Sequence, residues 1–330
     1  MDRITRTGKI VAFGIMALMI LPIFGAGAGE VFSRSELRYS SEKEIIDDFG
    51  RVVIIPETVE RIISVSPSAT EVLFALGLGD RVVGVSDWCD YPPEISTKVK
   101  DGVIKRVGGY STPKIEKIVS LEPDVVFISG IAGEEIVKTL ENVGLAVFAL
   151  KESQSISGIW DHISIMGKIA GVEEKAEELI SEMRDKINEI TEKVSGEEKA
   201  SIAAIVYPDP LWIVGLNTFT DEMIRIAGGS NVFSDKKGFS QVTHEKLISK
   251  DPDVLVVFEG HGSEGNMLDF IMNDERFKDL TAVKNERVYG IDENLLARDG
   301  PRVAEGIEAL YGCMHLYNKN EELQVTCQIV

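Results

Sequence analysis

An eleven-residue segment in the first half of this chain recurs in the second half, and this internal repeat restricts the fold more than any other feature. Residues 116–126 have the sequence EKIVSLEPDVV, and residues 245–255 have the sequence EKLISKDPDVL. Every difference but one exchanges one hydrophobic residue for another or Glu for Asp; the exception is Leu121, whose counterpart is Lys250. The two copies lie much too far apart for stacked solenoid repeats. The chain is therefore predicted to form two similar lobes.

Strand and helix patterns alternate through the first half of the chain. Short β-branched and apolar runs predict buried strands, and apolar residues at helical spacing predict helices between them. The predicted elements are a hairpin over 47–56 with its turn at Gly50, strands over 62–65, 82–85 and 123–128, and helices over 70–76 and 114–120. Such alternation is typical of a parallel, doubly wound sheet.

A long helical pattern separates the two halves. Apolar residues keep a helical spacing over 156–169, and a second run over 173–194 predicts one continuous helix of roughly 33 Å. Because a helix resists bending more than loops do, we expect the lobes to hinge little. We predict an α/β protein with two doubly wound lobes, whose parallel sheets are joined by a long rigid α-helix. The predicted parts are a signal peptide or N-terminal anchor (1–28), a linker (29–45), an N-terminal lobe (46–154), connecting helices (155–195), a C-terminal lobe (196–318) and a tail (319–330).

The N-terminal segment has the features of a secretory signal. Three basic residues precede an uncharged apolar run over 10–28 that ends in small residues. The run is also near the lower length limit of a membrane-spanning helix, so an uncleaved anchor is the alternative. The first cysteine is Cys89, so no cysteine follows the run to carry a lipid. We expect an exported protein, periplasmic or at the cell surface.

Charge and motifs exclude several function classes. With 35 Lys and Arg against 54 Asp and Glu, the net charge of −19 disfavours nucleic acid as a partner. No P-loop, GxSxG or HExxH pattern occurs, which favours a protein that is not an enzyme. The four histidines are scattered singly, so no metal site or cofactor is predicted. His261, in a Gly-rich loop after a predicted strand, is the histidine best placed for a ligand.

Three aromatic residues stand in predicted loops. Trp88, Tyr110 and Phe239 each have Gly, Ser or Pro neighbours near the ends of predicted strands. Large rings at such positions are candidates for a ligand cleft, and capping of the lobe cores is the alternative. Trp160 and Trp212 lie within helix or strand patterns and are predicted to pack in the core.

Over essentially the whole chain after the N-terminal run, the sequence resembles the substrate-binding proteins of ABC importers that have two α/β lobes and a rigid connecting helix. That family serves cobalamin, ferric siderophores and haem. Cobalamin-binding members are the most similar in four segments, which are 86–93 (SDWCDYPP), 116–124 (EKIVSLEPD), 239–245 (FSQVTHE) and 294–302 (NLLARDGPR).

The resemblance implies roles for individual residues. Trp88, Tyr110 and Phe239 fall where the cobalamin-binding protein has aromatic residues against the corrin. Arg298 matches a cleft arginine, and Asn294 stands where the relative has an aspartate. The residues that match the two lobe-surface glutamates, which in the family meet arginines on the permease subunits, are Glu116 and Glu245.

The resemblance thus implies a monomeric binding protein that captures a corrinoid and delivers it to an ABC permease dimer with a cytoplasmic ATPase. The alternative for Glu116 and Glu245 is that both are ordinary exposed residues of their helices. A ferric siderophore or haem is the alternative ligand, and a siderophore would favour a more cationic cleft. A tetrapyrrole metal chelatase is the alternative of another class, and it requires His261 or His162 in the cleft within reach of a carboxylate. A structural surface protein held by the N-terminal run is a further alternative.

Overall fold

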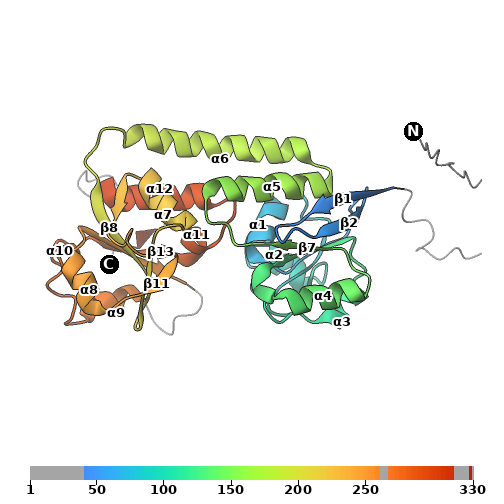
Figure 1. Ribbon diagram of the computed structural model, residues 1–330, viewed down its shortest axis with the longest axis horizontal. Helices are drawn as coiled ribbons and strands as arrows, with labels where there is room; N and C mark the ends of the chain where they lie inside the picture. The colour runs from blue at the N-terminus through green and yellow to red at the C-terminus, as the bar shows by residue number, and fades with distance from the viewer. Residues whose placement is uncertain (1–40, 261–266, 316–326, 329–330) are drawn as a thin grey trace, which may run out of the picture. The chain divides into compact units, whose positions relative to one another are not determined.

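The computed structural model describes residues 41–260, 267–315 and 327–328. They belong to one compact unit, Ser41–Val330. Within this unit, two α/β lobes are joined by α5 (Ile156–Ala170) and α6 (Glu173–Lys193), as Figure 1 shows. Among the described residues no helix is long and apolar enough to cross a membrane. The predicted signal or anchor segment, 1–28, lies outside them.

The N-terminal lobe is built on a parallel sheet with the strand order β5-β4-β3-β6-β7. The predicted hairpin is β1 paired with β2, and Gly50 has the positive φ of +77° that its turn requires. Because β1 begins at Glu42, the hairpin starts inside the segment predicted as a linker. The elements are β1 Glu42–Ile46, β2 Val52–Pro56, β3 Ile62–Ser64, α1 Pro67–Ala75, β4 Val82–Val85, α2 Glu94–Lys100, β5 Lys105–Arg106, α3 Ile115–Ser120, β6 Val125–Ser129, the 3₁₀ turn η1 Gly130–Ala132, α4 Glu134–Asn142 and β7 Val147–Leu150.

The C-terminal lobe has a mixed sheet with the order β11-β9-β8-β12-β13-β14, and β10 pairs with β8. Its centre, β8, β12 and β13, is parallel as predicted. The strands β9, β11 and β14 pair antiparallel, and β9 does so because a tight turn joins it directly to β8. The elements are β8 Ala200–Pro208, β9 Leu211–Val214, α7 Phe219–Ile226, β10 Gly229–Asn231, β11 Phe239–Gln241, α8 His244–Lys250, β12 Val254–Glu259, α9 Met267–Asn273, α10 Thr281–Lys284, β13 Val288–Asp292, α11 Glu293–Ala297, α12 Val303–His315 and β14 Cys327–Gln328.

The internal repeat forms the same unit in both lobes. Each copy contains a short helix, α3 or α8, that leads into a central strand, β6 or β12. The aspartate before each strand accepts hydrogen bonds from the start of the neighbouring strand. Asp124 accepts from the backbone N–H groups of Glu60 and Arg61, at 2.8 Å each. Asp253 accepts from the N–H of Ser201 at 2.9 Å and from its hydroxyl at 2.7 Å. The repeated Pro-Asp pair therefore ties the same two strands together in each lobe.

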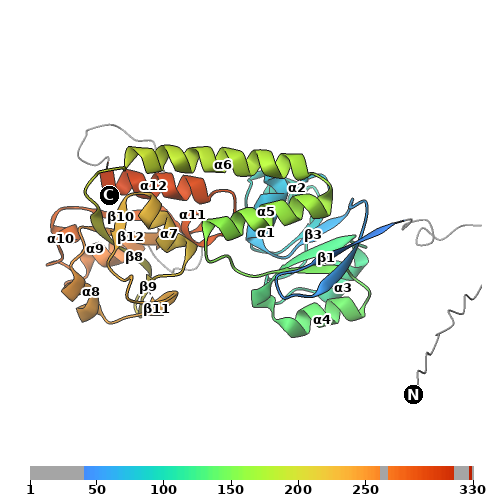
Figure 2. The same ribbon diagram turned by 45° about the horizontal axis from the view of Figure 1, so that its top comes forward.

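The connecting helices are part of the hydrophobic core. The buried residues of α6 recur every three or four positions and face the lobes, while the charged residues between them are mostly exposed. Gly167 of α5 lies so close to α6 that an added Cβ would stand 2.6 Å from the Cβ of Ala176. One continuous cluster of buried side chains runs from the N-terminal lobe through both helices into the C-terminal lobe. The connecting helices are thus held by packing against both lobes, as the predicted rigid connection requires. Figure 2 shows α6 lying along α5 and α12.

Candidate functional site

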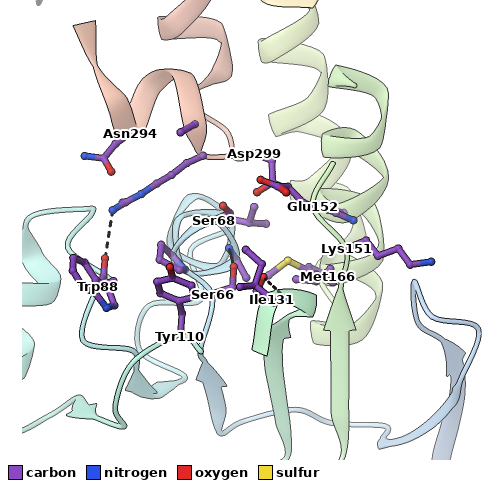
Figure 3. Close-up of a pocket in the computed structure, with 18 of the residues that line it drawn as sticks. Ser66, Ser68, Trp88, Tyr110, Ile131, Lys151, Glu152, Met166, Asn294 and Asp299 are labelled. Carbon is purple, nitrogen blue, oxygen red and sulfur yellow. Dashed lines mark hydrogen bonds between the residues drawn. The ribbon is translucent and has the colours of Figure 1, made fainter. Parts of the chain in front are cut away.

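A cleft of about 390 Å³ lies between the two lobes. The N-terminal lobe supplies the start of α1, the loops after β4 and β5, and the ends of β6 and β7. α5 contributes His162 and Met166, and the C-terminal lobe contributes α11 with the residues that follow it. Figure 3 shows Trp88 and Tyr110 on one side of this cleft and Glu152 and Asp299 on another.

Two aromatic rings form the apolar wall of the cleft. The ring centroids of Trp88 and Tyr110 are 6.4 Å apart and the rings meet edge to face at 69°. A backbone bond of 2.8 Å from Asp87 to Gly108 joins the two loops. Arg106 stabilises the loop that carries Trp88. Its Nη1 donates to the carbonyl oxygens of Ser86 at 2.5 Å and Cys89 at 2.7 Å. Half of Trp88 nevertheless remains exposed, so its ring is available to a ligand.

A buried carboxylate links the lobes behind the cleft. The side chain of Glu71, on α1, is only 1% exposed and receives two arginines of the C-terminal lobe. Arg302 binds it through Nε and Nη2, at 2.8 and 2.7 Å, and Arg298 through Nη1 at 2.9 Å. Arg298 Nη1 also donates to Asp90 at 2.7 Å. We call Glu71, Asp90, Arg298 and Arg302 the interlobe brace.

The brace favours the charged form of Arg298 and contacts the loop that carries Trp88. Burial lowers the pKa of Arg298, but the hydrogen bonds to Asp90 and Glu71 outweigh it and leave the pKa above its usual value. Nη2 of Arg298 also lies 3.4 Å from the carbonyl oxygen of Trp88. The guanidinium of Arg302 lies 3.9 Å from the centre of the Tyr91 ring. The C-terminal lobe thereby contacts the loop that carries Trp88.

A second polar cluster closes the other end of the cleft. Nε2 of His162 lies 2.8 Å from Oδ2 of Asp48, and its Nδ1 lies 3.2 Å from Oγ of Ser153. Burial lowers the pKa of His162, but the bond to Asp48 and the nearby acidic charges raise it above its usual value. The backbone N–H of Ser153 donates to Asp299 of the C-terminal lobe at 2.8 Å. Burial and the charge of Asp299 raise the pKa of Glu152.

Four of the five residues predicted to bind a ligand line this cleft, which are Trp88, Tyr110, Asn294 and Arg298. The guanidinium of Arg298 is engaged by the brace, and the side-chain amide of Asn294 donates to Asp292 at 2.8 Å.

The fifth, Phe239, is not among the residues that line this cleft, so its role in ligand binding stays a prediction. The sequence predicts a loop around Phe239, whereas this segment forms the edge strand β11, in which Phe239 pairs with Val214. Trp212, predicted to lie in the core, is 38% exposed on the neighbouring strand β9.

The histidines bear on the chelatase alternative. His162 lines the cleft next to a carboxylate, as that alternative requires. Both of its ring nitrogens, however, have hydrogen-bond partners within the protein. Over the described ranges no three His, Cys, Asp or Glu side chains are grouped so that they could hold a metal ion. His261 lies outside the residues that the structure describes.

The brace is not predicted by the sequence patterns, although one signal for it is present. Glu71 is the only charged residue of α1, and a buried carboxylate must find a cationic partner. Its partner Arg302 lies 231 positions away in the chain. Spacing within a sequence does not reveal such a pair.

The two predicted docking residues, Glu116 on α3 and Glu245 on α8, are exposed. They lie on different lobes and not at the cleft. Each stands at the second position of its short helix.

Comparisons with known proteins agree with this architecture. The profile of the periplasmic binding protein family matches residues 62–295. An uncharacterised ABC transporter substrate-binding lipoprotein of Bacillus subtilis is 32% identical over 306 residues, which cover 89% of this chain and 94% of the relative. The crystal structure of the vitamin B12-binding protein of Vibrio cholerae has a TM-score of 0.66 at 25% identity and covers 80% of this chain and 100% of that one. A periplasmic haem-binding protein of Roseiflexus has a TM-score of 0.68 at 26% identity and covers 77% of this chain and 99% of that one.

Proposed function

The chain belongs to the periplasmic binding protein family, and we propose that it captures a corrinoid in its interlobe cleft and delivers it to an ABC permease. The observation that carries this proposal is the aromatic wall, because Trp88 and Tyr110 face a cleft between two rigidly joined lobes. A relative and a solved structure named for vitamin B12 binding support it. The protein itself performs no chemistry in this role.

The corrinoid is bound by apolar contact with its macrocycle and by hydrogen bonds to the amide groups around the edge of that macrocycle. Trp88 and Tyr110 bury apolar surface against the macrocycle, since large aromatic side chains bury the most area per residue. Asn294 and the hydroxyl groups of Ser66 and Ser68 line the same cleft and serve the amide groups of the ligand. Arg298 holds the two walls together rather than serving as a free donor.

The charge of the cleft favours a corrinoid over haem or an anionic ferric siderophore. Apart from His162, the acidic and basic side chains that line it are two cations, Lys151 and Arg298, and three carboxylates, Glu152, Glu293 and Asp299. One of the cations is already paired with carboxylates of the brace. Carboxylate groups of haem would meet like charge, whereas cyanocobalamin is uncharged and surrounded by amides. Haem remains the second candidate because a haem-binding protein is among the similar structures.

Delivery assigns the two exposed glutamates to the permease. One carboxylate per lobe, Glu116 and Glu245, suits a two-fold membrane partner with one basic site per subunit. The protein acts as a monomer outside the cytoplasm, where the N-terminal run serves as a signal or as a membrane anchor. The ATPase that drives transport lies on the other side of the membrane.

Calorimetric titration with cyanocobalamin, cobinamide, haem and a ferric hydroxamate tests the proposed ligand. We expect heat with the two corrinoids and a dissociation constant at least tenfold weaker for haem. Saturable binding of haem or the hydroxamate with no heat from either corrinoid would reject the corrinoid while leaving capture of a solute in the cleft intact.

A further inference from the structure

The two copies of the internal repeat have nearly the same conformation as well as similar sequences. In α3, the hydroxyl of Ser120 donates to the carbonyl of Lys117 at 2.8 Å. In α8, the hydroxyl of Ser249 donates to the carbonyl of Lys246, also at 2.8 Å. Both helices therefore end in the same local hydrogen bond.

The chain leaves the two helices in the same way. Glu122 and Asp251, at equivalent positions of the repeat, have positive φ values of +44° and +40°. One residue of each helix, Ile118 in α3 and Leu247 in α8, is fully buried and anchors the helix on its sheet. The opposite face of each helix is thereby fixed in the same orientation relative to its own lobe.

Each of these outer faces carries an acidic and an apolar side chain. Val119 is 39% exposed and Ile248 is 40% exposed, and each lies three residues after the exposed glutamate of its helix. Residues three apart are neighbours on a helix surface, so Glu116 lies beside Val119 and Glu245 beside Ile248. A single exposed aliphatic residue is ordinary. Its recurrence at the equivalent position of the second lobe, beside the same acid, is not.

We infer that Val119 and Ile248 are apolar docking residues, and that each completes a two-part contact with Glu116 or Glu245 for one subunit of a two-fold membrane permease. We call Glu116 with Val119, and Glu245 with Ile248, the paired patches. The inference rests on the proposed function and adds to it the chemistry of the partner. Each permease subunit should offer a basic group bordered by apolar surface.

The position of the paired patches fits such a partner. Figures 1 and 2 show α3 and α8 on different lobes, both on the side of the unit away from α6. The core that includes α5 and α6 joins the lobes, which fixes the distance between the patches. Carboxylates provide attraction that depends on ionic strength, and aliphatic side chains provide attraction that does not. The two parts can therefore be separated by experiment.

The test measures binding of the full chain to its purified permease–ATPase complex in lipid nanodiscs. Serine replaces the aliphatic residues in Val119→Ser, Ile248→Ser and the double variant. We expect each single change to weaken binding about fivefold, because the permease can no longer bury the exposed aliphatic surface of that residue. The double change should weaken it about 25-fold, since distant sites act independently. Val143→Ser, at a residue that is 50% exposed outside the patches, should have no effect.

Two further readouts make the outcome decisive. The variants at Val119 and Ile248 should keep the wild-type dependence of binding on salt, whereas Glu116→Gln and Glu245→Gln should reduce it. Cyanocobalamin affinity should be unchanged in all of them, so failure of the corrinoid proposal would be seen separately. Wild-type permease binding by the double serine variant would overturn the inference. A concentration-dependent dimer that the double variant abolishes would assign the patches to a second copy of this chain and overturn it as well.

Discussion

The two lobes are alike where they face outward and different where they face each other. On the outside, α3 and α8 each carry an exposed glutamate beside an exposed aliphatic residue and end in the same hydrogen bond. The aspartate after each helix makes the same kind of contact with a neighbouring strand. At the cleft, the N-terminal lobe supplies aromatic rings, whereas the C-terminal lobe supplies Asn294, Arg298 and acidic groups. A symmetric partner needs equal outer faces, but a ligand with two unlike sides needs unlike walls. Under the proposed function, docking falls to the outer faces that are alike and ligand recognition to the cleft walls that differ.

In the interlobe brace, a buried carboxylate of the N-terminal lobe meets two arginines of the C-terminal lobe. Breaking this contact should have the largest effect on stability. Glu71→Gln removes the carboxylate shared by Arg302, which is buried, and Arg298, which is partly buried. We expect the free energy of unfolding to fall by about 3–5 kcal/mol, because uncompensated buried charges remain. Urea denaturation measures the loss. Glu94→Gln, at an exposed residue near the same helix, is the control. A loss under about 1 kcal/mol would show that the brace contributes little to stability.

Aromatic residues of the two lobes should respond differently to removal, because Trp88 lines the cleft and Phe239 does not. Trp88→Ala is expected to weaken cyanocobalamin binding about 30-fold, which corresponds to about 2 kcal/mol of aromatic contact. Phe239→Ala should change it less than twofold, because Phe239 does not line the cleft. Calorimetry with both variants checks this. Equal losses would show that the ligand reaches β11 and that the binding surface extends beyond the cleft.

The like parts should respond equally. Asp124→Ala and Asp253→Ala each leave two donors of a neighbouring strand without their acceptor. We expect each change to lower the free energy of unfolding by about 1–3 kcal/mol. The two losses, measured in the same urea titration, should agree within about 0.5 kcal/mol. A large inequality would mean that the repeated aspartates support their lobes to different degrees.

The smallest expected effect concerns pH. His162 in the folded protein has a raised pKa, with Asp48, Asp161 and Asp299 as the acidic groups around it. Its contribution to stability is fully present below its unfolded pKa of about 6.5 and is lost as pH rises through the folded pKa. His162→Gln should cost about 1 kcal/mol at pH 6 and less at pH 9. The free energy of unfolding of both proteins is measured from pH 6 to pH 9. A constant difference between wild type and variant over this range would contradict the raised pKa of His162.

The fold was predictable from the sequence because its signals are local or repeated. Apolar runs predict the strands β3, β4 and β6 and the helix α6, and the internal repeat predicts two similar lobes. The edge strand β11 was not predicted, since its three residues, Phe239–Gln241, lie among turn residues. The cleft aromatic residues could be proposed because loops at strand ends meet at one edge of a parallel sheet. The brace could not, because the pairing of Glu71 with Arg302 depends on how the two lobes close on each other.

The most direct test is a crystal structure of the protein with cyanocobalamin, recorded at the cobalt absorption edge so that anomalous scattering locates the metal. A single cobalt peak between the lobes, with the corrin against Trp88 and Tyr110, is the predicted result. A cobalt peak on another surface, or full occupancy of the cleft by a different solute when cobalamin is in excess, would contradict the proposal that this cleft is built for a corrinoid.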